Sequence, residues 1–239
     1  MDDELRMLAN VPIYIHDAGS LHIPTLRDIA ILGEENYNEI LSLLLLNKKN
    51  IPHLRDKPVS NFDILFANCA YSPDLWSRVK IGLELLFKEE AHMSDVGENV
   101  YFYFSEDSEK RHITSENFEY IQSLLIIANN IKIESEEEYN PANAKAAELI
   151  KRLEAGKQYV SRKKKQIVSL SSKISGLAWK SNSINMINIW DLNIYQFYDA
   201  LFKVEQIDNY LFTLQGIYSG NVDGKKIKLN DLHWGNKIT

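Results

Sequence analysis

Residues 134–153 read ESEEEYNPANAKAAELIKRL, an acidic run followed directly by an alanine-rich segment with basic residues. Asn140 is a favourable N-cap and Pro141 is tolerated at the first helical position, so a long helix is predicted to begin here. The acidic residues then lie before the positive end of the helix macrodipole, and the basic residues lie toward its negative end. The acidic stretch is therefore the predicted boundary between an α+β domain, 1–132, and a helical domain, 133–239.

The basic run in this predicted helix allows two interpretations. Lys163, Lys164 and Lys165 follow Arg162 in the sequence. Charge runs on helices are usually solvated faces, and here they would stabilise the negative end of the helix. The alternative is a patch that binds a partner, so the three lysines are kept as candidate binding residues.

The chain before the acidic stretch begins with strand signals and a capped helix. Residues 11–15 and 21–23 are apolar and flank the turn-forming sequence DAGS, which predicts a small hairpin. Thr25, followed three residues later by Asp28, predicts a capped helix that Gly33 breaks or bends. Beyond the glycine, apolar residues recur at helical spacing and predict a second helix with one core-facing side: Tyr37, Ile40, Leu41, Leu44 and Leu45.

Two more helices are predicted before the next strands. The first covers residues 61–70. The second begins at Ser72-Pro73, because serine is a favourable N-cap and proline suits the first helical position.

The aromatic run VYFYF at 100–104 is the strongest strand signal in the chain, and residues 111–113 are its expected hairpin partner. Thr114 or Ser115 then caps a further helix. The predicted fold class is mainly α: an α+β N-terminal part with two small β-hairpins, followed by an all-helical C-terminal part.

The C-terminal part is rich in aromatic residues. A helix is predicted over 167–180, and Asp191 is the expected N-cap of the next helix, which should break near Asp208. Aromatic side chains dominate protein interfaces, so six residues are candidate anchors for a protein partner: Trp190, Tyr195, Phe197, Tyr198, Phe202 and Tyr210. Core packing is the alternative explanation for these side chains.

Composition limits the possible functions. The 239 residues are 45% hydrophobic, which is enough to bury a sizeable core. A formal net charge of -6 means that the molecule as a whole does not attract nucleic acid or an anionic membrane. Cys69 is the single cysteine, which excludes an internal disulfide and favours a reducing compartment. The sequence shows neither an export signal nor an apolar run long enough for a membrane span.

Motifs for catalysis or for binding a metal or cofactor are not evident. The closest approach to a metal cluster is His16, Asp17 and His22, which a hairpin could bring together, although hairpin-edge residues are the simpler explanation. Cys69 lies in an apolar helical pattern, where a free cysteine packs as a small hydrophobic residue and a nucleophile is the less favoured alternative. We therefore expect neither an enzyme nor a resident metal or cofactor.

Several stretches together resemble a group of tail-gene proteins from phages of Gram-positive bacteria, known as tail assembly chaperones or as uncharacterised tail proteins. The stretches are IPTLRDI at 23–29, ITSENFE at 113–119, NPAN at 140–143 and IWDLNIYQFYD at 189–199. The resemblance implies a non-enzymatic protein of the infected bacterial cytoplasm that holds the helical tape-measure protein while the tail tube grows. The tail-tube protein is a second candidate partner.

Three alternatives remain at the level of sequence. One is a structural component of the virion, such as a tail or baseplate subunit. The second is an enzyme of an unfamiliar class, which convergent polar groups in a deep pocket around Cys69 or His16 would favour. The third is a nucleic-acid-binding accessory protein acting through residues 162–165, which the negative net charge disfavours.

Overall fold

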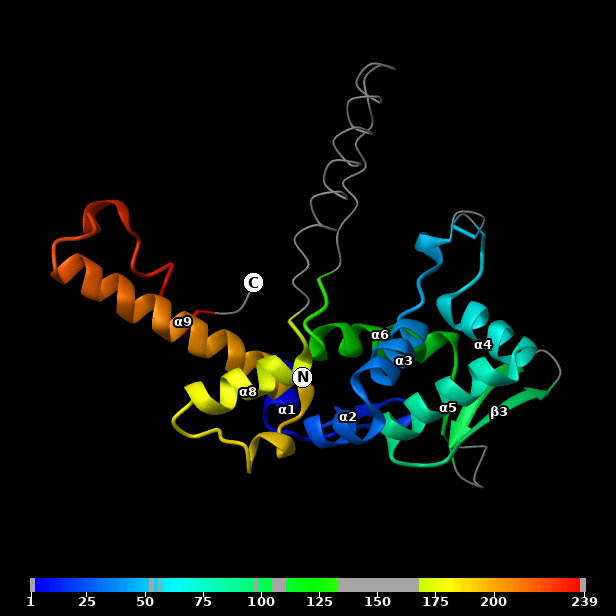
Figure 1. Ribbon diagram of the computed structural model, residues 1–239. Coiled ribbons are helices and arrows are strands. Elements are labelled where there is room, and N and C mark those ends of the chain that lie inside the picture. Colours follow the sequence, from blue (N-terminus) through cyan, green and yellow to red (C-terminus); the bar gives the residue numbers. More distant parts are fainter. Residues whose placement is uncertain are drawn as a thin grey trace, which may run out of the picture.

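In a computed structural model, the chain forms a mainly helical body from which one long helix projects (Figure 1). The structure describes residues 3–51, 54–55, 57–96, 99–104, 111–132 and 168–236. The long helix predicted to begin at Asn140, together with the lysine run at 163–165, lies outside these residues.

The chain opens with a short helix and a hairpin. Helix α1 (Asp3–Leu8) precedes strands β1 (Ile13–Ile15) and β2 (Gly19–Leu21), which pair antiparallel with Ile13 opposite Leu21. The first predicted hairpin is thus confirmed. Gly19 has a φ of +99°, a conformation that side chains with a Cβ rarely adopt, so glycine suits the start of β2.

The next two helices are separated as the sequence predicts. Helix α2 (Leu26–Leu32) begins with a capping box, in which the Thr25 hydroxyl accepts from Asp28 N and the Asp28 carboxylate accepts from Thr25 N. Gly33, at φ +92°, ends α2 and precedes α3 (Glu34–Leu44). Tyr37, Ile40 and Leu44 form the buried side of α3.

A 3₁₀ turn, η1 (Lys48–Asn50), leads to two packed helices. Helix α4 (Asn61–Tyr71) has a capping box at Ser60, and α5 (Pro73–Phe87) begins with the expected Ser72 cap and proline. Helix α5 packs closely on α3, because Gly82 carries no Cβ at the point of contact with Ile40.

The second β unit is a three-stranded sheet, whereas the sequence predicts a two-stranded hairpin at this place. Strand β4 (Asn99–Phe104) pairs antiparallel with β5 (His112–Ile113) as expected, and its other edge pairs with β3 (Ala91–Val96). The sequence AHMSDV of β3 has one β-branched residue, Val96, and none of Phe, Tyr or Trp, so its strand signal is weak. Its pairing with β4 therefore overrides a weak local preference.

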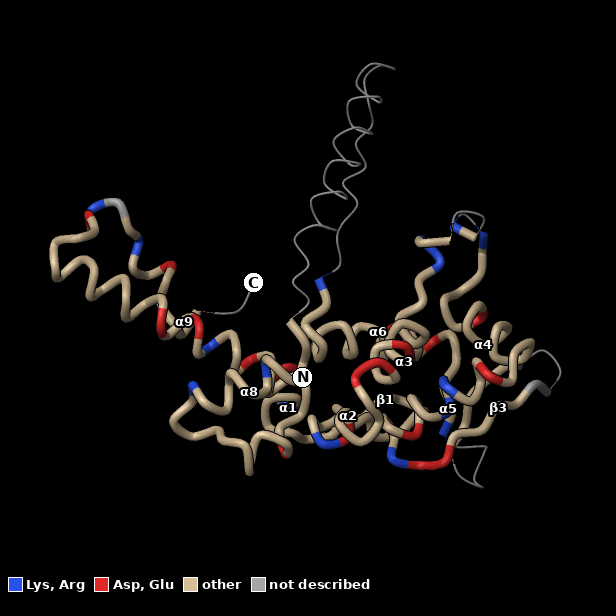
Figure 2. The backbone as a smooth tube through the Cα atoms, in the orientation of Figure 1, with Lys and Arg blue, Asp and Glu red and all other residues tan. Residues whose placement is uncertain are grey.

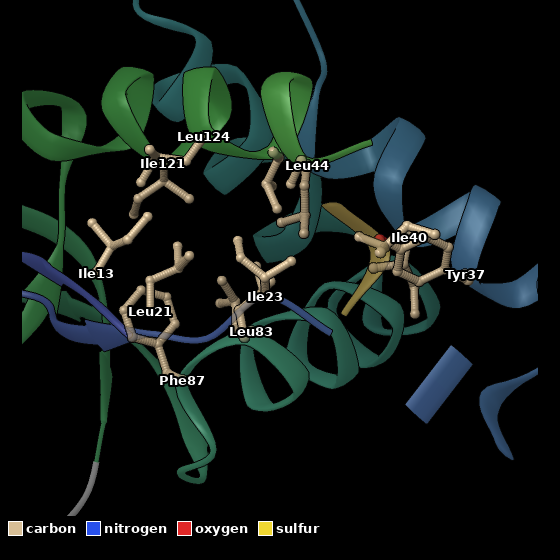
Figure 3. Close-up of a cluster of buried hydrophobic side chains, with 14 of the residues drawn as sticks. Ile13, Leu21, Ile23, Tyr37, Ile40, Leu44, Leu83, Phe87, Ile121 and Leu124 are labelled. Atoms are coloured by element: carbon tan, nitrogen blue, oxygen red, sulfur yellow. The ribbon is translucent and has the colours of Figure 1, made fainter. Parts of the chain in front are cut away.

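Helix α6 (Ser115–Ala128), capped by Thr114, closes the core over the hairpin. Figure 3 shows Leu21, Leu83, Ile121 and their neighbours pointing from the hairpin, α5 and α6 into one shared interior. A group of aromatic side chains continues this interior under the three-stranded sheet. In this group, Phe62 meets Phe102 edge to face, with ring centroids 5.4 Å apart.

The described C-terminal part consists of helix α8 (Leu170–Lys180), two 3₁₀ turns, η2 (Ile189–Asp191) and η3 (Gly224–Lys226), and helix α9 (Ile194–Tyr218). Two details correct the sequence predictions. The N-cap of α9 is Asn193 rather than Asp191, and α9 runs through Asp208 as one helix of 25 residues. Asp191 instead forms an ion pair with Arg27 at 3.0 Å.

The base of α9 is built into the N-terminal part. Thr25 and Asn193, the caps of α2 and α9, pair as an antiparallel bridge, and Ile194 N donates to the Pro24 carbonyl at 2.9 Å. Ile194 and Phe197 belong to the same buried cluster as the N-terminal core. The hydrophobic core is therefore continuous across residue 132, whereas a division of the chain into two domains there stays a prediction.

Candidate functional site

A cavity of about 460 Å³ lies where α6 ends against the first turns of α9. We call it the α6–α9 cavity. Tyr195, Tyr198 and Phe202, three of the six aromatic residues singled out in the sequence, line it together. They come from successive turns of α9, so helical periodicity places them on one side. Residues of α1, of α6 and the positions just after its end, of α9 itself and of the C-terminal end complete the lining: Glu4, Ile126, Ile127, Asn130, Ile131, Asp199, Lys203, Gly235 and Asn236.

The charged groups of this cavity are arranged around Lys203. Partial burial raises the pKa of the Asp199 carboxyl, while the nearby Lys203 ammonium opposes that shift. The ammonium itself donates hydrogen bonds to the carbonyls of Trp234 and Asn236, at 3.1 and 2.9 Å. The C-terminal end of the described chain is thereby held at the rim of the cavity.

A second cavity, of about 570 Å³, lies on the other side of Tyr198 between α3, α8 and α9. Tyr37 lines it, and its hydroxyl donates a 2.8 Å hydrogen bond to Asn129 Oδ1. The Lys173 ammonium lies 5.6 Å from the centre of the Tyr198 ring, within the range of a cation–π contact. Tyr198 thus separates two hollows beside the base of α9.

The other candidate anchors differ in their surroundings. Phe197 is fully buried, so it belongs to the core and offers no surface to a partner. Trp190 is half-buried, and its indole N–H donates to the Met186 carbonyl at 3.0 Å. Tyr210 is half-buried beneath the ring of His233, with the two ring centroids 5.4 Å apart.

Large apolar side chains outside the six candidate anchors are exposed on α8 and α9. Trp179, near the end of α8, is 82% exposed, and Phe212 and Tyr218 on α9 are 65% and 84% exposed. The far part of α9 has no charged residue between positions 209 and 222, which Figure 2 shows as an unbroken tan segment. Exposed apolar surface without intervening charge is typical of an interaction surface.

A regular spacing in α9 could have identified this surface. Apolar residues recur at alternating intervals of four and three, the spacing of a coiled-coil seam: Ala200, Val204, Ile207, Leu211, Leu214 and Tyr218. The residues near the base of α9 pack on the core, whereas Leu211 is 55% exposed. We call this row the α9 stripe. The expectation of a break near Asp208 concealed it in the sequence.

The histidines of the hairpin do not meet. The strand register places His16 at the turn and His22 at the opposite end of the two-stranded ladder, and His16 instead pairs with Asp17 at 2.7 Å. Burial and the charge of Lys88 lower the pKa of His22. Within the residues that the structure describes, no group of three His, Cys, Asp or Glu side chains could hold a metal ion.

Cys69 lies on the buried side of α4. Burial raises the pKa of its thiol to about 12, so the thiol stays protonated at neutral pH. This environment is that of a packing residue.

Comparison with known proteins gives one match. Residues 162–239 match the family model described as YomV second domain, a phage-derived family. The match begins at the basic run and includes α8, the two cavity-lining turns of α9 and the C-terminal end. Searches of the curated proteins and of the solved structures found no match. Among the helices that the structure describes, none combines the length and apolar character needed to cross a bilayer.

Proposed function

We propose that this protein is a non-enzymatic tail assembly chaperone of a phage, which binds the tape-measure protein in the cytoplasm of the infected bacterial host. The observation that carries the proposal is the group of exposed apolar side chains on the far part of α9, where no charge intervenes, together with exposed Trp179 on α8. The match of residues 162–239 to a phage-derived family supports the phage context.

The chemistry of this surface suits a helical client. An amphipathic helix presents apolar residues at intervals of three and four, and the α9 stripe has the same spacing. Two such rows can pack side by side, with the knobs of one helix entering the holes of the other. Helix α9 projects from the body of the molecule (Figure 1).

Co-purification with a co-expressed tape-measure protein tests the proposal. A double variant, Leu211→Ser with Tyr218→Ser, removes two exposed apolar side chains from the α9 stripe and should strongly reduce capture. The matched control is Ile31→Ser with Tyr71→Ser, since these side chains are 82% and 93% exposed on α2 and α4. The control should capture the client as the unmodified protein does. Equal capture by both double variants would remove α9 from the binding surface.

The α9 stripe also favours a second candidate, a structural subunit of the tail or baseplate. Coiled-coil spacing is used for permanent contacts between subunits as well as for transient clients. Mass spectrometry of purified particles separates the two functions. A chaperone should be absent from the finished particle, whereas a structural subunit should be present at a fixed copy number.

A further inference from the structure

We propose that the C-terminal segment 221–236 is a displaceable cover for the α6–α9 cavity and for the side of α9 next to it. We call this segment the strap. It lies, within the same chain, on Tyr210 and at the rim of the cavity, where a helical client bound along the α9 stripe would find further aromatic surface, and in this last respect the inference rests on the proposed function.

The strap turns back sharply where α9 ends. The amides of Asn221 and Val222 both donate to the Gly216 carbonyl, at 3.0 and 3.1 Å. A Cβ at position 216 would lie 2.9 Å from Val222 Cγ2, so glycine allows the strap to approach the helix. Gly220, at φ +74°, supplies the left-handed residue of this reversal.

Lys203 holds the far end of the strap. Its ammonium donates to two strap carbonyls, those of Trp234 and Asn236, and to Gln206 Oε1 at 3.2 Å. Hydrogen bonds from a charged donor are stronger than those between neutral groups. Lys203 is therefore the main polar tie between the strap and α9 near the cavity.

Aromatic packing attaches the strap to α9 at a second point, Tyr210, about two helical turns beyond Lys203. The His233 ring meets the Tyr210 ring edge to face and stacks on Trp234 with centroids 5.0 Å apart. Gly235 and Asn236, which follow directly, line the same cavity as Tyr195 and Phe202. The strap thus covers aromatic surface with its own aromatic residues.

The strap can open at low cost. Its only regular element is the 3₁₀ turn η3. Much of its apolar surface is exposed to solvent even in the closed position, and Trp234 is 49% exposed. Segments with few buried apolar contacts open far more often than a core does. Opening would expose the cavity-lining faces of Tyr195 and Phe202 without disturbing the buried base of α9.

Hydrogen exchange of the full chain tests the hold of Lys203 on the strap. Lys203→Met keeps the length of the side chain and removes the donors. Exchange of the strap amides should accelerate about tenfold, the factor that corresponds to losing roughly one hydrogen bond from a charged group. Lys225→Met is the control, because Lys225 is an exposed strap residue whose backbone N–H, not its ammonium, makes the hydrogen bond to Asp223. Unchanged exchange in Lys203→Met would overturn the proposal.

A shortened protein that ends at Gly220 tests the cover itself. It should bind the apolar dye 1-anilinonaphthalene-8-sulfonate more strongly than the full chain while its circular dichroism spectrum keeps the helical signal. A synthetic peptide of residues 221–236 added to the shortened protein should reverse the gain. The same peptide with His233→Ala and Trp234→Ala should reverse it less.

Two results would contradict a displaceable cover. One is unchanged dye binding after shortening, and the other is loss of helical signal, which would make the strap a structural part of α9. The dye assay uses no client, so it separates this inference from the proposed function. If neither the full nor the shortened chain captures the tape-measure protein while the dye and peptide results hold, the client assignment fails and the cover stands.

Discussion

The side-chain amide of Asn193 donates a 2.8 Å hydrogen bond to the carbonyl of Met7, and its Nδ2 also donates to Asn10 Oδ1 at 3.0 Å. The Oδ1 atom of the same fully buried residue accepts from Gln196 N at 2.8 Å as the cap of α9. One asparagine thus ties the start of α9 to the end of α1.

Replacing Asn193 with alanine should therefore be costly. The change removes a helix cap and leaves the Met7 carbonyl buried without this donor, so we expect the free energy of unfolding to fall by about 2–4 kcal/mol. Urea unfolding followed by circular dichroism measures the loss. Asn209→Ala, on the exposed side of the same helix, should change the stability by less than about 0.5 kcal/mol.

Two phenylalanines of α9, one buried and one exposed, should contribute very differently to stability. Phe197→Ala should lower the free energy of unfolding by about 3–5 kcal/mol, because the ring is fully buried and its removal leaves a cavity. Phe212→Ala should leave stability nearly unchanged, because its ring is 65% exposed. Thermal unfolding of the two variants compares them directly. Equal losses would show that the far part of α9 is packed in solution.

Two helical glycines should respond in opposite ways to alanine. At position 82 a Cβ would lie 2.5 Å from Ile40 Cγ2, so Gly82→Ala should force α3 and α5 apart and cost about 1–3 kcal/mol. At position 176 a Cβ meets no atom within 4 Å, so Gly176→Ala should stabilise α8 by about 0.5–1 kcal/mol. The midpoint of denaturant unfolding should fall for Gly82→Ala and rise for Gly176→Ala. A stabilised Gly82→Ala variant would contradict the close packing of α3 on α5.

Tyr37 should make the protein sensitive to alkali. Burial raises the pKa of its phenol above the ordinary value of 10.0. Above about pH 10 the unfolded chain loses this proton while the folded chain keeps it. The contribution of Tyr37 to the free energy of unfolding is therefore fully present below that pH and is lost as pH rises toward the folded pKa.

Stability measurements with and without the hydroxyl check this expectation. Tyr37→Phe should cost about 1–3 kcal/mol at neutral pH, because Asn129 Oδ1 loses its donor, and should decline less steeply above pH 10. Tyr71→Phe, at a tyrosine that is 93% exposed, should leave the stability at neutral pH unchanged. Parallel curves for Tyr37→Phe and the unmodified protein would mean that Tyr37 ionises equally in both states.

The parts of the fold that local sequence determines were predictable. Thr25 and Ser72 cap their helices as expected, and of the two candidates Thr114 and Ser115 the cap of α6 is Thr114, because a cap depends on a few neighbouring residues. Strand β3 was missed because its sequence has little strand preference and its pairing with β4 is a tertiary effect.

The candidate site was predictable only in part. Helical periodicity groups Tyr195, Tyr198 and Phe202, and they do line one cavity. The same reasoning could not separate Phe197, which packs on the core, from its exposed counterparts, because burial is decided by distant residues. The contacts of Lys203 with the strap depend on a chain reversal after α9, which no local pattern of charges indicates.

The bridge between Thr25 and Asn193 has a mechanical consequence. It anchors one end of a rod of 25 residues, while the opposite end stands clear of the body (Figure 1). Such a rod is about 37 Å long, so a tilt of about 10° at its anchor would swing its tip by about 6 Å. Small adjustments among the residues around the anchor are thus amplified into a large sweep at the tip.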